Sequence, residues 1–172
     1  RLVGEAESSR RPHLPAFIRL ALNTGCRRGE LLGLEWDRVD FQHHKILLEA
    51  WHTKTRKRRV VPLNADAAGA LLRLRAWQGA HCLSSSWVFG YDEDKHIKSF
   101  KTSWATALRR SGIENFRIHD LRHTFASWLV MQGVSIYVVR DLLGHASVTQ
   151  TEIYAHLAPS QAVDAVRLLP SF

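Results

Sequence analysis

The sequence has little cysteine, no long apolar run and fewer acidic than basic residues. Two cysteines in 172 residues, Cys26 and Cys82, are too few for a disulfide framework or a cysteine-based metal cluster, so we expect a reducing, cytosolic compartment. No stretch is apolar over enough residues to cross a membrane, and none has the pattern of a signal peptide, so we expect no membrane partner. Because the first residue is Arg1 rather than Met, we expect a domain cut from a longer protein.

The charge balance favours an anionic partner. There are 16 acidic residues against 24 basic ones, which gives a net charge of +8. Most of the basic residues are arginines, whose planar guanidinium binds phosphate through two donors at once. Nucleic acid is the commonest partner for such a chain, and a merely basic soluble protein is the alternative. The length and the 45% hydrophobic content suit one globular domain with a real core.

The spacing of apolar residues predicts an α+β fold that is mostly helical, with a small sheet beside a bundle of about seven to eight helices. Three segments have strand patterns and predict a three-stranded antiparallel sheet: residues 39–41, 45–50 and 59–63. Residues 81–93 are expected to form a loop in which residues 87–89 are extended. Residues 1–13 are polar and predict a linker or a short surface helix.

The predicted helices are bounded by ordinary start and stop residues. Pro15 suits a first turn, Asn64, Ser135 and Ser147 suit N-caps, and Gly112 and Gly144 suit helix ends. Ile153 and Tyr154 are expected inside the short helix that follows Ser147. The helical segments are residues 15–23, 27–34, 64–77, 98–111, 119–133, 135–144, the stretch after 147, and 160–169.

The segment around His119 carries the first functional signal. His119 and Arg122 are three residues apart, which places them on one face of a helix. An apolar stripe follows at helical spacing, formed by Leu121, Phe125 and Trp128. A helix start also attracts anions through its free N–H groups and its dipole. The segment therefore predicts a phosphate-binding helix start, and the alternative is a core helix with a polar first turn.

Two further basic positions lie at turns. Arg27 falls in a tight turn between two predicted helices, which is a rigid place from which to aim a side chain inward. A structural ion pair of Arg27 with Glu30 or Glu35 is the alternative, and we interpret Glu30 as a structural residue that orients Arg27. The run from Lys54 to Arg59 lies between two predicted strands, where it forms either a solvated loop or a hairpin that carries a lysine into a groove.

Four motifs, in order along residues 14–158, resemble the catalytic domain of the tyrosine recombinases, the phage integrase family. Tyr154 follows His145 by nine residues, as in that family, and the ending Tyr-Ala-His-x-Ala-Pro-Ser is most similar to temperate-phage integrases. The matching stretches are residues 24–31 (TGCRRGEL), 54–63 (ending VPL), 119–126 (HDLRHTFA), and 142–145 (LLGH) with 154–156 (YAH).

The resemblance implies a mechanism for cleaving and rejoining DNA. Tyr154 would attack a phosphodiester, form a 3′-phosphotyrosyl link and free a 5′-hydroxyl. Arg27 and Arg122 would hold the non-bridging oxygens, and Lys54 would protonate the leaving oxygen. The two histidines that would assist are His119 and His145. DNA contacts are expected from Lys54, Arg56, Lys57, Arg58 and Arg59.

The resemblance also implies partners and domain limits. We expect no metal and no cofactor, because two guanidiniums can supply the charge stabilisation that phosphoryl transfer needs. The expected partners are double-stranded DNA attachment sites, further copies in a tetramer on DNA, and a host DNA-bending protein, in the nucleoid of a bacterial cytoplasm. Residues 1–13 would link to an upstream DNA-binding domain. Residues 159–172 would form a helix, packed on its own domain or exchanged between protomers.

Other interpretations stay open from the residues alone. Tyr154 by itself suits a half-buried packing residue. His119 and His123, at i and i+4, suit a zinc pair, although no third ligand has convincing spacing and Arg122 between them would repel a cation. His123 is better interpreted as a buried polar residue behind the site. The competing functions are a transposon integrase or resolvase of the same family, a DNA-binding module without catalysis, and a zinc-dependent nuclease.

Overall fold

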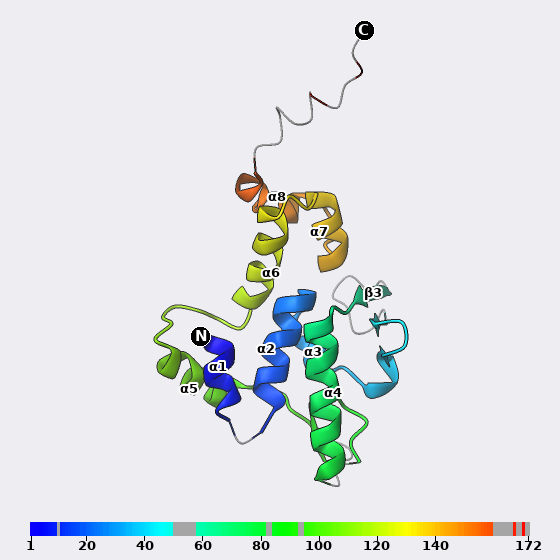
Figure 1. The fold of residues 1–172 in the computed structure, drawn as a ribbon, viewed down its shortest axis with the longest axis vertical. Coiled ribbons are helices and arrows are strands. Elements are labelled where there is room, and N and C mark those ends of the chain that lie inside the picture. The colour runs from blue at the N-terminus through cyan, green and yellow to red at the C-terminus, as the bar shows by residue number, and fades with distance from the viewer. Residues whose placement is uncertain are drawn as a thin grey trace.

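A computed structural model describes residues 1–9, 11–49, 58–81, 84–92 and 95–159, together with residues 167 and 170. The chain forms a large lobe, made of helices α1–α5 and two small sheets, and a narrower small lobe, made of most of α6 with α7 and α8 (Figure 1). The described α-helices are α1 (Leu2–Glu7), α2 (His13–Thr24), α3 (Arg28–Leu32), α4 (Ala65–Ala80), α5 (Lys101–Ser111), α6 (Asp120–Met131), α7 (Ile136–Leu143) and α8 (Thr149–Glu152).

Helix α2 is the central element of the large lobe because it is apolar on almost every side. Phe17, Ile18 and Leu20 are fully buried, and the helix packs against α1, α4 and α6. It ends at Gly25, whose φ of 62° is left-handed. A Cβ on Gly25 would lie 2.4 Å from the ring of Phe125 in the small lobe, so only glycine fits this junction.

The predicted three-stranded antiparallel sheet is confirmed. Strands β1 (Val39–Asp40), β2 (Lys45–Leu48) and β3 (Arg59–Pro62) lie in the order β1-β2-β3. Ile46 faces Val61 across β2 and β3, and both side chains are buried under the sheet. The β2–β3 connection over residues 50–57 lies outside the described residues.

The loop expected over residues 81–93 contains more order than its sequence suggested. Strands β4 (Gly90–Asp92) and β5 (Lys95–His96) form a short antiparallel pair, and Trp87 makes a β-bridge with Glu35. Strands of two and three residues are too short to show an alternating pattern, which is why the prediction missed them.

The N-terminal segment is docked on the large lobe. Helix α1 buries Leu2 and Ala6 and packs against α2 and α5. Arg1 Nη2 donates a hydrogen bond to the Ser111 carbonyl at 2.6 Å. Of the two structures expected for residues 1–13, the short helix is present over residues 2–7. Among the described residues, no helix is long and apolar enough to span a membrane.

The small lobe has a core of its own, formed by Phe125, Ala126, Val130, Val139, Leu143 and Tyr154. Ser135 caps α7 as predicted, because its hydroxyl accepts a hydrogen bond from the Tyr137 N–H. The helix expected to hold Ile153 and Tyr154 ends earlier, at Glu152. Tyr154 lies between α8 and a 3₁₀ turn, η3 (Ala155–Leu157), and this break lets its side chain turn into the core.

Candidate active site

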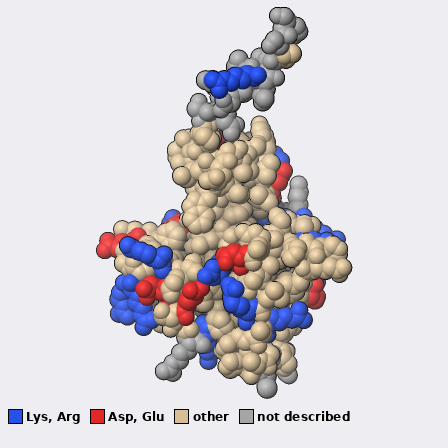
Figure 2. Space-filling view, in the orientation of Figure 1, with Lys and Arg blue, Asp and Glu red and all other residues tan. Residues whose placement is uncertain are grey.

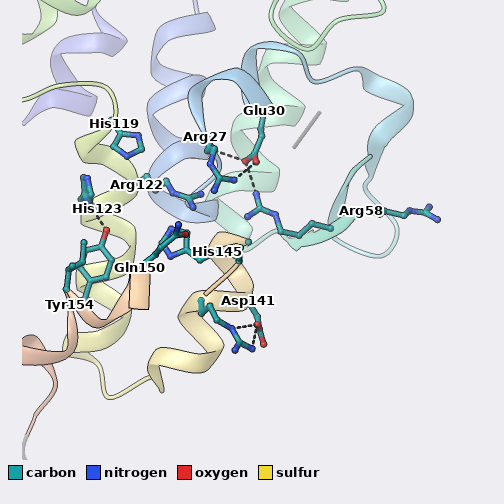
Figure 3. Close-up of a pocket in the computed structure, with 15 residues that line it drawn as sticks. Arg27, Glu30, Arg58, His119, Arg122, His123, Asp141, His145, Gln150 and Tyr154 are labelled. Atoms are coloured by element: carbon teal, nitrogen blue, oxygen red, sulfur yellow. Dashed lines mark hydrogen bonds and ion pairs between the residues drawn. The ribbon is translucent and has the colours of Figure 1, made fainter. Parts of the chain in front are cut away.

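An open cleft of about 990 Å³ lies where the two lobes meet, and it collects most of the predicted functional residues (Figure 3). The large lobe contributes the start of α3 and strand β3, and the small lobe contributes α6, α7 and α8. The lining residues are Arg27, Glu30, Arg58, Arg59, His119, Arg122, His123, Arg140, Asp141, Gly144, His145, Ala146, Gln150, Ile153 and Tyr154.

Arg122 is fixed at the junction of the lobes. The residue is only 4% exposed, and its guanidinium donates to two backbone carbonyls, that of Gly25 at 2.6 Å and that of Leu143 at 2.8 Å. Burial, together with the nearby charge of Arg27, lowers the pKa of Arg122 to about 10. The group therefore stays protonated at neutral pH and offers a preorganised positive charge to the cleft.

Glu30 organises two further arginines of the cleft, Arg27 and Arg59. Its buried carboxylate accepts a hydrogen bond from the Arg27 N–H at 2.8 Å and forms an ion pair with the Arg27 guanidinium at 3.0 Å. Arg59 approaches the same carboxylate at 2.7 Å and donates to the Leu142 carbonyl at 3.1 Å. The Arg27–Glu30 ion pair considered from the sequence is thus present. Arg27 also lines the cleft. The single carboxylate of Glu30 balances only one of the two arginines paired with it, so a net positive charge remains there.

The histidines of the cleft are held in different ways. His119 is the N-cap residue of α6, and its ring packs edge-on against that of His123 with centroids 4.9 Å apart. Burial and the charges of His123 and Arg122 lower the pKa of His119. His145 Nδ1 is hydrogen-bonded to the Thr151 hydroxyl at 2.9 Å.

Burial and the charges of Arg122, Arg27 and Arg59 lower the pKa of His145 to about 4. His145 is therefore neutral at pH 7. A neutral imidazole can donate a hydrogen bond to a phosphate oxygen through its protonated ring nitrogen, but it adds no charge to the cleft.

Tyr154 reaches the cleft of its own chain. The residue is 6% exposed, and its hydroxyl is hydrogen-bonded to Nδ1 of His123 (Figure 3). Burial raises the pKa of Tyr154, and the charge of Arg122 partly opposes this rise. The contact with His123 was missed from the sequence, because nothing in the spacing of residues 123 and 154 indicates that their side chains meet.

The basic hairpin is only partly described. Lys54, Arg56 and Lys57 lie outside the described residues, so their predicted roles stay predictions. Arg58 lines the cleft with an exposed side chain, 3.5 Å from Glu49. Arg59 has a side chain only 10% exposed and is bonded to Glu30 and Leu142, so its described contacts are within the protein.

The zinc interpretation finds no support in the described residues. No group there holds three or more His, Cys, Asp or Glu side chains placed to share a metal ion. His123, one of the two candidate ligands, instead has its Nδ1 atom engaged with the hydroxyl of Tyr154.

Comparison with known proteins settles the family. The model of the phage integrase family matches residues 1–161. The chain belongs to this family. It is 35% identical to the integrase of Salmonella phage P22 over 99% of its own length and 45% of that protein. This chain therefore spans less than half the length of that relative.

Solved structures agree with the family and the fold. The catalytic domain of bacteriophage HP1 integrase has a TM-score of 0.74 and 31% identity, over 99% of this chain and 90% of that one. The XerA recombinase has a TM-score of 0.77 and 26% identity, over 99% of this chain and 62% of that one. The predicted fold, helices beside a small antiparallel sheet, is thus confirmed as that of a tyrosine recombinase catalytic domain.

Proposed function

We propose that this chain is the strand-cleaving and strand-joining domain of a site-specific DNA recombinase that integrates or excises a mobile element. One observation carries the proposal above the others: a tyrosine hydroxyl lies in the same cleft as two arginines that the protein holds in place before any ligand binds. The family membership and the net charge of +8 support DNA as the substrate.

Charge stabilisation by Arg27 and Arg122 is the first part of the mechanism. Phosphoryl transfer depends on positioning and on neutralising charge at the phosphate oxygens, and an arginine at such a site is worth about 10³ to 10⁵ in rate. Arg122 is bonded to carbonyls of both lobes, and Arg27 is bonded to Glu30. Both guanidiniums can therefore meet the non-bridging oxygens with little further ordering.

The covalent step conserves the energy of the broken bond. The Tyr154 oxygen forms a bond to phosphorus while the bond from phosphorus to the 5′-oxygen breaks. The tyrosine loses its proton, and the leaving oxygen gains one, which we assign to Lys54 from the family resemblance. The result is a 3′-phosphotyrosyl link that a second 5′-hydroxyl can attack in reverse, so exchange needs no nucleotide cofactor.

The two family histidines assist at the phosphate in this proposal. Neutral His145 would donate a hydrogen bond from the ring nitrogen that does not bind Thr151. His119, at the first residue before α6, lies on the same side of the cleft as Arg122 and would contact the phosphate as it develops charge.

DNA binding by the hairpin would be largely non-specific. Arg58 stands exposed at the cleft, and Lys54, Arg56 and Lys57 precede it in the chain. Contacts of lysine and arginine with phosphates release counterions, so the affinity should fall steeply as salt rises. A gel shift that is unchanged between low and moderate salt would contradict this assignment.

Self-association on DNA is supported by the surface of the small lobe. Five large apolar side chains on or beside α6–α8 are exposed, namely Trp128, Met131, Tyr137, Val138 and Ile153. Figure 2 shows that the described part of this lobe is almost free of charged side chains on the viewed face. Such a surface suits contact with another protomer, as a tetramer requires.

The test uses supercoiled plasmid with EDTA present and an SDS quench. Wild-type protein should yield relaxed DNA and DNA-linked protein, and Tyr154→Phe should yield neither while still shifting DNA in a gel. A DNA-binding module without catalysis would give no adduct from either protein. Strand cleavage without any adduct, seen only when EDTA is left out, would instead favour a metal-dependent nuclease.

A further inference from the structure

We propose that His123 is a catalytic residue that accepts the proton of Tyr154 when the tyrosine attacks DNA. The proposal rests on the proposed function, because it assigns a partner to the same nucleophile. His123 lies within the matching stretch 119–126, but the resemblance assigns roles in that stretch only to His119 and Arg122.

The contact is between the reacting atom and one ring nitrogen. His123 lies in α6 one turn after His119, and its Nδ1 atom is hydrogen-bonded to the Tyr154 hydroxyl. The two rings lie 5.9 Å apart between centroids, tilted by 51°. Figure 3 shows the tyrosine hydroxyl directed at His123 rather than at His145. The nucleophilic oxygen therefore lies within hydrogen-bond reach of a ring nitrogen, which accepts its proton when the imidazole carries its own proton on Nε2.

Both partners are held by the surrounding packing. Tyr154 belongs to the buried core of the small lobe, together with Phe125 and Leu143. His123 is partly buried within a regular helix, with the ring of His119 against it at an interplanar angle of 87°. The geometry thus exists in the free protein and needs no DNA to form, which is what a positioned base requires.

An acceptor is needed because the phenol is harder to ionise here than in water. Burial raises the pKa of Tyr154, so removing its proton to solvent before attack would cost more than for an ordinary tyrosine. A neighbouring imidazole removes the proton as the new bond forms and avoids a free phenolate.

Other basic groups in the described part of the cleft are less suited to the task. His145 is hydrogen-bonded to Thr151, and burial together with the surrounding arginines lowers its pKa to about 4. Glu30 is committed to Arg27 and Arg59. His119 contacts the edge of His123 and makes no hydrogen bond to Tyr154. His123 alone among these groups touches the nucleophilic oxygen.

The protons balance over cleavage and rejoining. During cleavage, the Tyr154 proton moves to Nδ1 of His123 as the oxygen–phosphorus bond forms, and the 5′-oxygen leaves with a proton from the general acid. During rejoining, the incoming 5′-hydroxyl gives its proton back to the acid, and His123 returns its proton to the tyrosine oxygen. No oxidant, metal or co-reactant is consumed.

The first test measures the rate of adduct formation on supercoiled plasmid by His123→Asn and His123→Ala. The asparagine side chain can still hydrogen-bond near the Nδ1 position but cannot take up a proton, so it separates proton transfer from positioning. Both variants should form adduct about 10²-fold or more slowly than wild type while binding DNA normally. Adduct formation by His123→Asn at the wild-type rate would overturn the proposal.

His44→Asn is the matched control. His44 is exposed in the β1–β2 turn with a φ of 49°, a left-handed conformation that asparagine tolerates well. Its adduct rate should equal that of wild type. Thermal unfolding of all three variants checks that a slow rate is not a loss of folding.

The pH dependence gives a second readout. A base that takes up the tyrosine proton makes the rate fall at acidic pH, and His123→Asn should lack that acidic limb. The ionisable groups whose charges act near His123 are His119, Asp120, His145 and Tyr154, so His119→Asn is measured in parallel. An acidic limb that survives in His123→Asn and disappears in His119→Asn would assign the base to His119 instead.

A third readout does not depend on activity. Nitrogen-15 NMR of the histidine rings distinguishes a neutral His123 that carries its proton on Nε2 from one that carries it on Nδ1. We expect the Nε2 form, with a Nδ1 signal that changes in Tyr154→Phe. A proton on Nδ1 would make His123 the donor and would contradict the proposal. If wild type formed no adduct, the proposed function would fail. The spectrum would still show whether His123 accepts a hydrogen bond from Tyr154.

Discussion

The large lobe contains most of the buried core, whereas the small lobe contributes most of the predicted catalytic side chains. The large lobe holds most of the buried apolar side chains, from α2, α4 and the three-stranded sheet, yet its described residues give the cleft Arg27 as the one predicted catalytic group. The small lobe has a core of a few residues but supplies His119, Arg122, His145 and Tyr154. The proposed nucleophile, Tyr154, is itself part of that small core. The large lobe holds the larger core, and most of the proposed catalytic side chains lie on the lobe with the smaller one.

Polar contacts join the two lobes at the site itself. Arg122 donates to Gly25 in the large lobe and to Leu143 in the small one, and Arg59 links Glu30 to Leu142 in the same way. Loosening this junction should therefore affect catalysis and stability together, whereas changes elsewhere on either lobe should not.

Arg122→Lys should produce the largest loss. Lysine keeps the positive charge but cannot reach two carbonyls and a phosphate oxygen in one plane. We expect adduct formation to fall by about 10³-fold or more. We also expect one buried carbonyl to lose its donor, at a cost of about 1–3 kcal/mol in the free energy of unfolding. The exposed Arg73→Lys is the control, and equal losses in the two variants would contradict the junction role.

Glu30→Gln should be the next most severe change. It preserves the shape of the side chain but leaves the guanidiniums of Arg27 and Arg59 without their shared carboxylate. Breaking a buried ion pair costs about 3–5 kcal/mol, so chemical denaturation should show a loss of that order. Adding Arg59→Gln should restore part of the lost stability. A double variant that is less stable than Glu30→Gln would show that repulsion between the arginines is not the cause.

Gly25→Ala should have a smaller but clear effect at the same junction. The added Cβ would press on the ring of Phe125 and on Leu143 at 2.9 Å, in a backbone conformation with positive φ. We expect a loss of about 1–3 kcal/mol, visible as a lower melting temperature. Gly4→Ala, in α1 with open space around it, should be neutral or slightly stabilising. A neutral Gly25→Ala would mean that the lobes can separate without penalty.

The pH dependence of stability should show the smallest effect. His145 has a pKa near 4 when folded and near 6.5 when unfolded, so between these values the unfolded chain binds more protons. Stability should therefore fall as the pH drops from about 6.5 to 4, with no further loss from this group below that. His13 and His119, whose pKa values are also lowered, act in the same direction. The contribution of His145 is the difference between wild type and His145→Gln in the free energy of unfolding, measured across this pH range. Parallel curves for the two proteins would contradict the predicted contribution.

The sequence predicted the fold and the positions of the site better than the contacts within it. Helix α6, the break at Gly25 and the sheet follow from patterns of apolar residues and from glycine at left-handed turns, so they were predicted from local residues. The β4–β5 pair is too short for such a pattern. The direction of a side chain depends on packing between distant segments, which spacing along the chain does not encode.

Arg59 and His123 illustrate that limit. Arg59 was grouped with the DNA-contacting hairpin because it ends a basic run, yet its side chain turns back to Glu30. His123 was interpreted as a polar residue behind the site. It instead contacts the hydroxyl of Tyr154, because helix α8 ends at Glu152 and Tyr154 then packs back against α6. In both cases the sequence indicated a residue near the site but not the side chain that it contacts.

The measurement that tests the central claim most directly is the chemical identity of the covalent complex. Wild-type protein is incubated with plasmid in EDTA, quenched with SDS, digested with nuclease and protease, and analysed by mass spectrometry. The account predicts nucleotide attached through a 3′-phosphate to the peptide that contains Tyr154, with a free 5′-hydroxyl on the other side of the break. Nucleotide on another residue, or attachment through a 5′-phosphate, would contradict it.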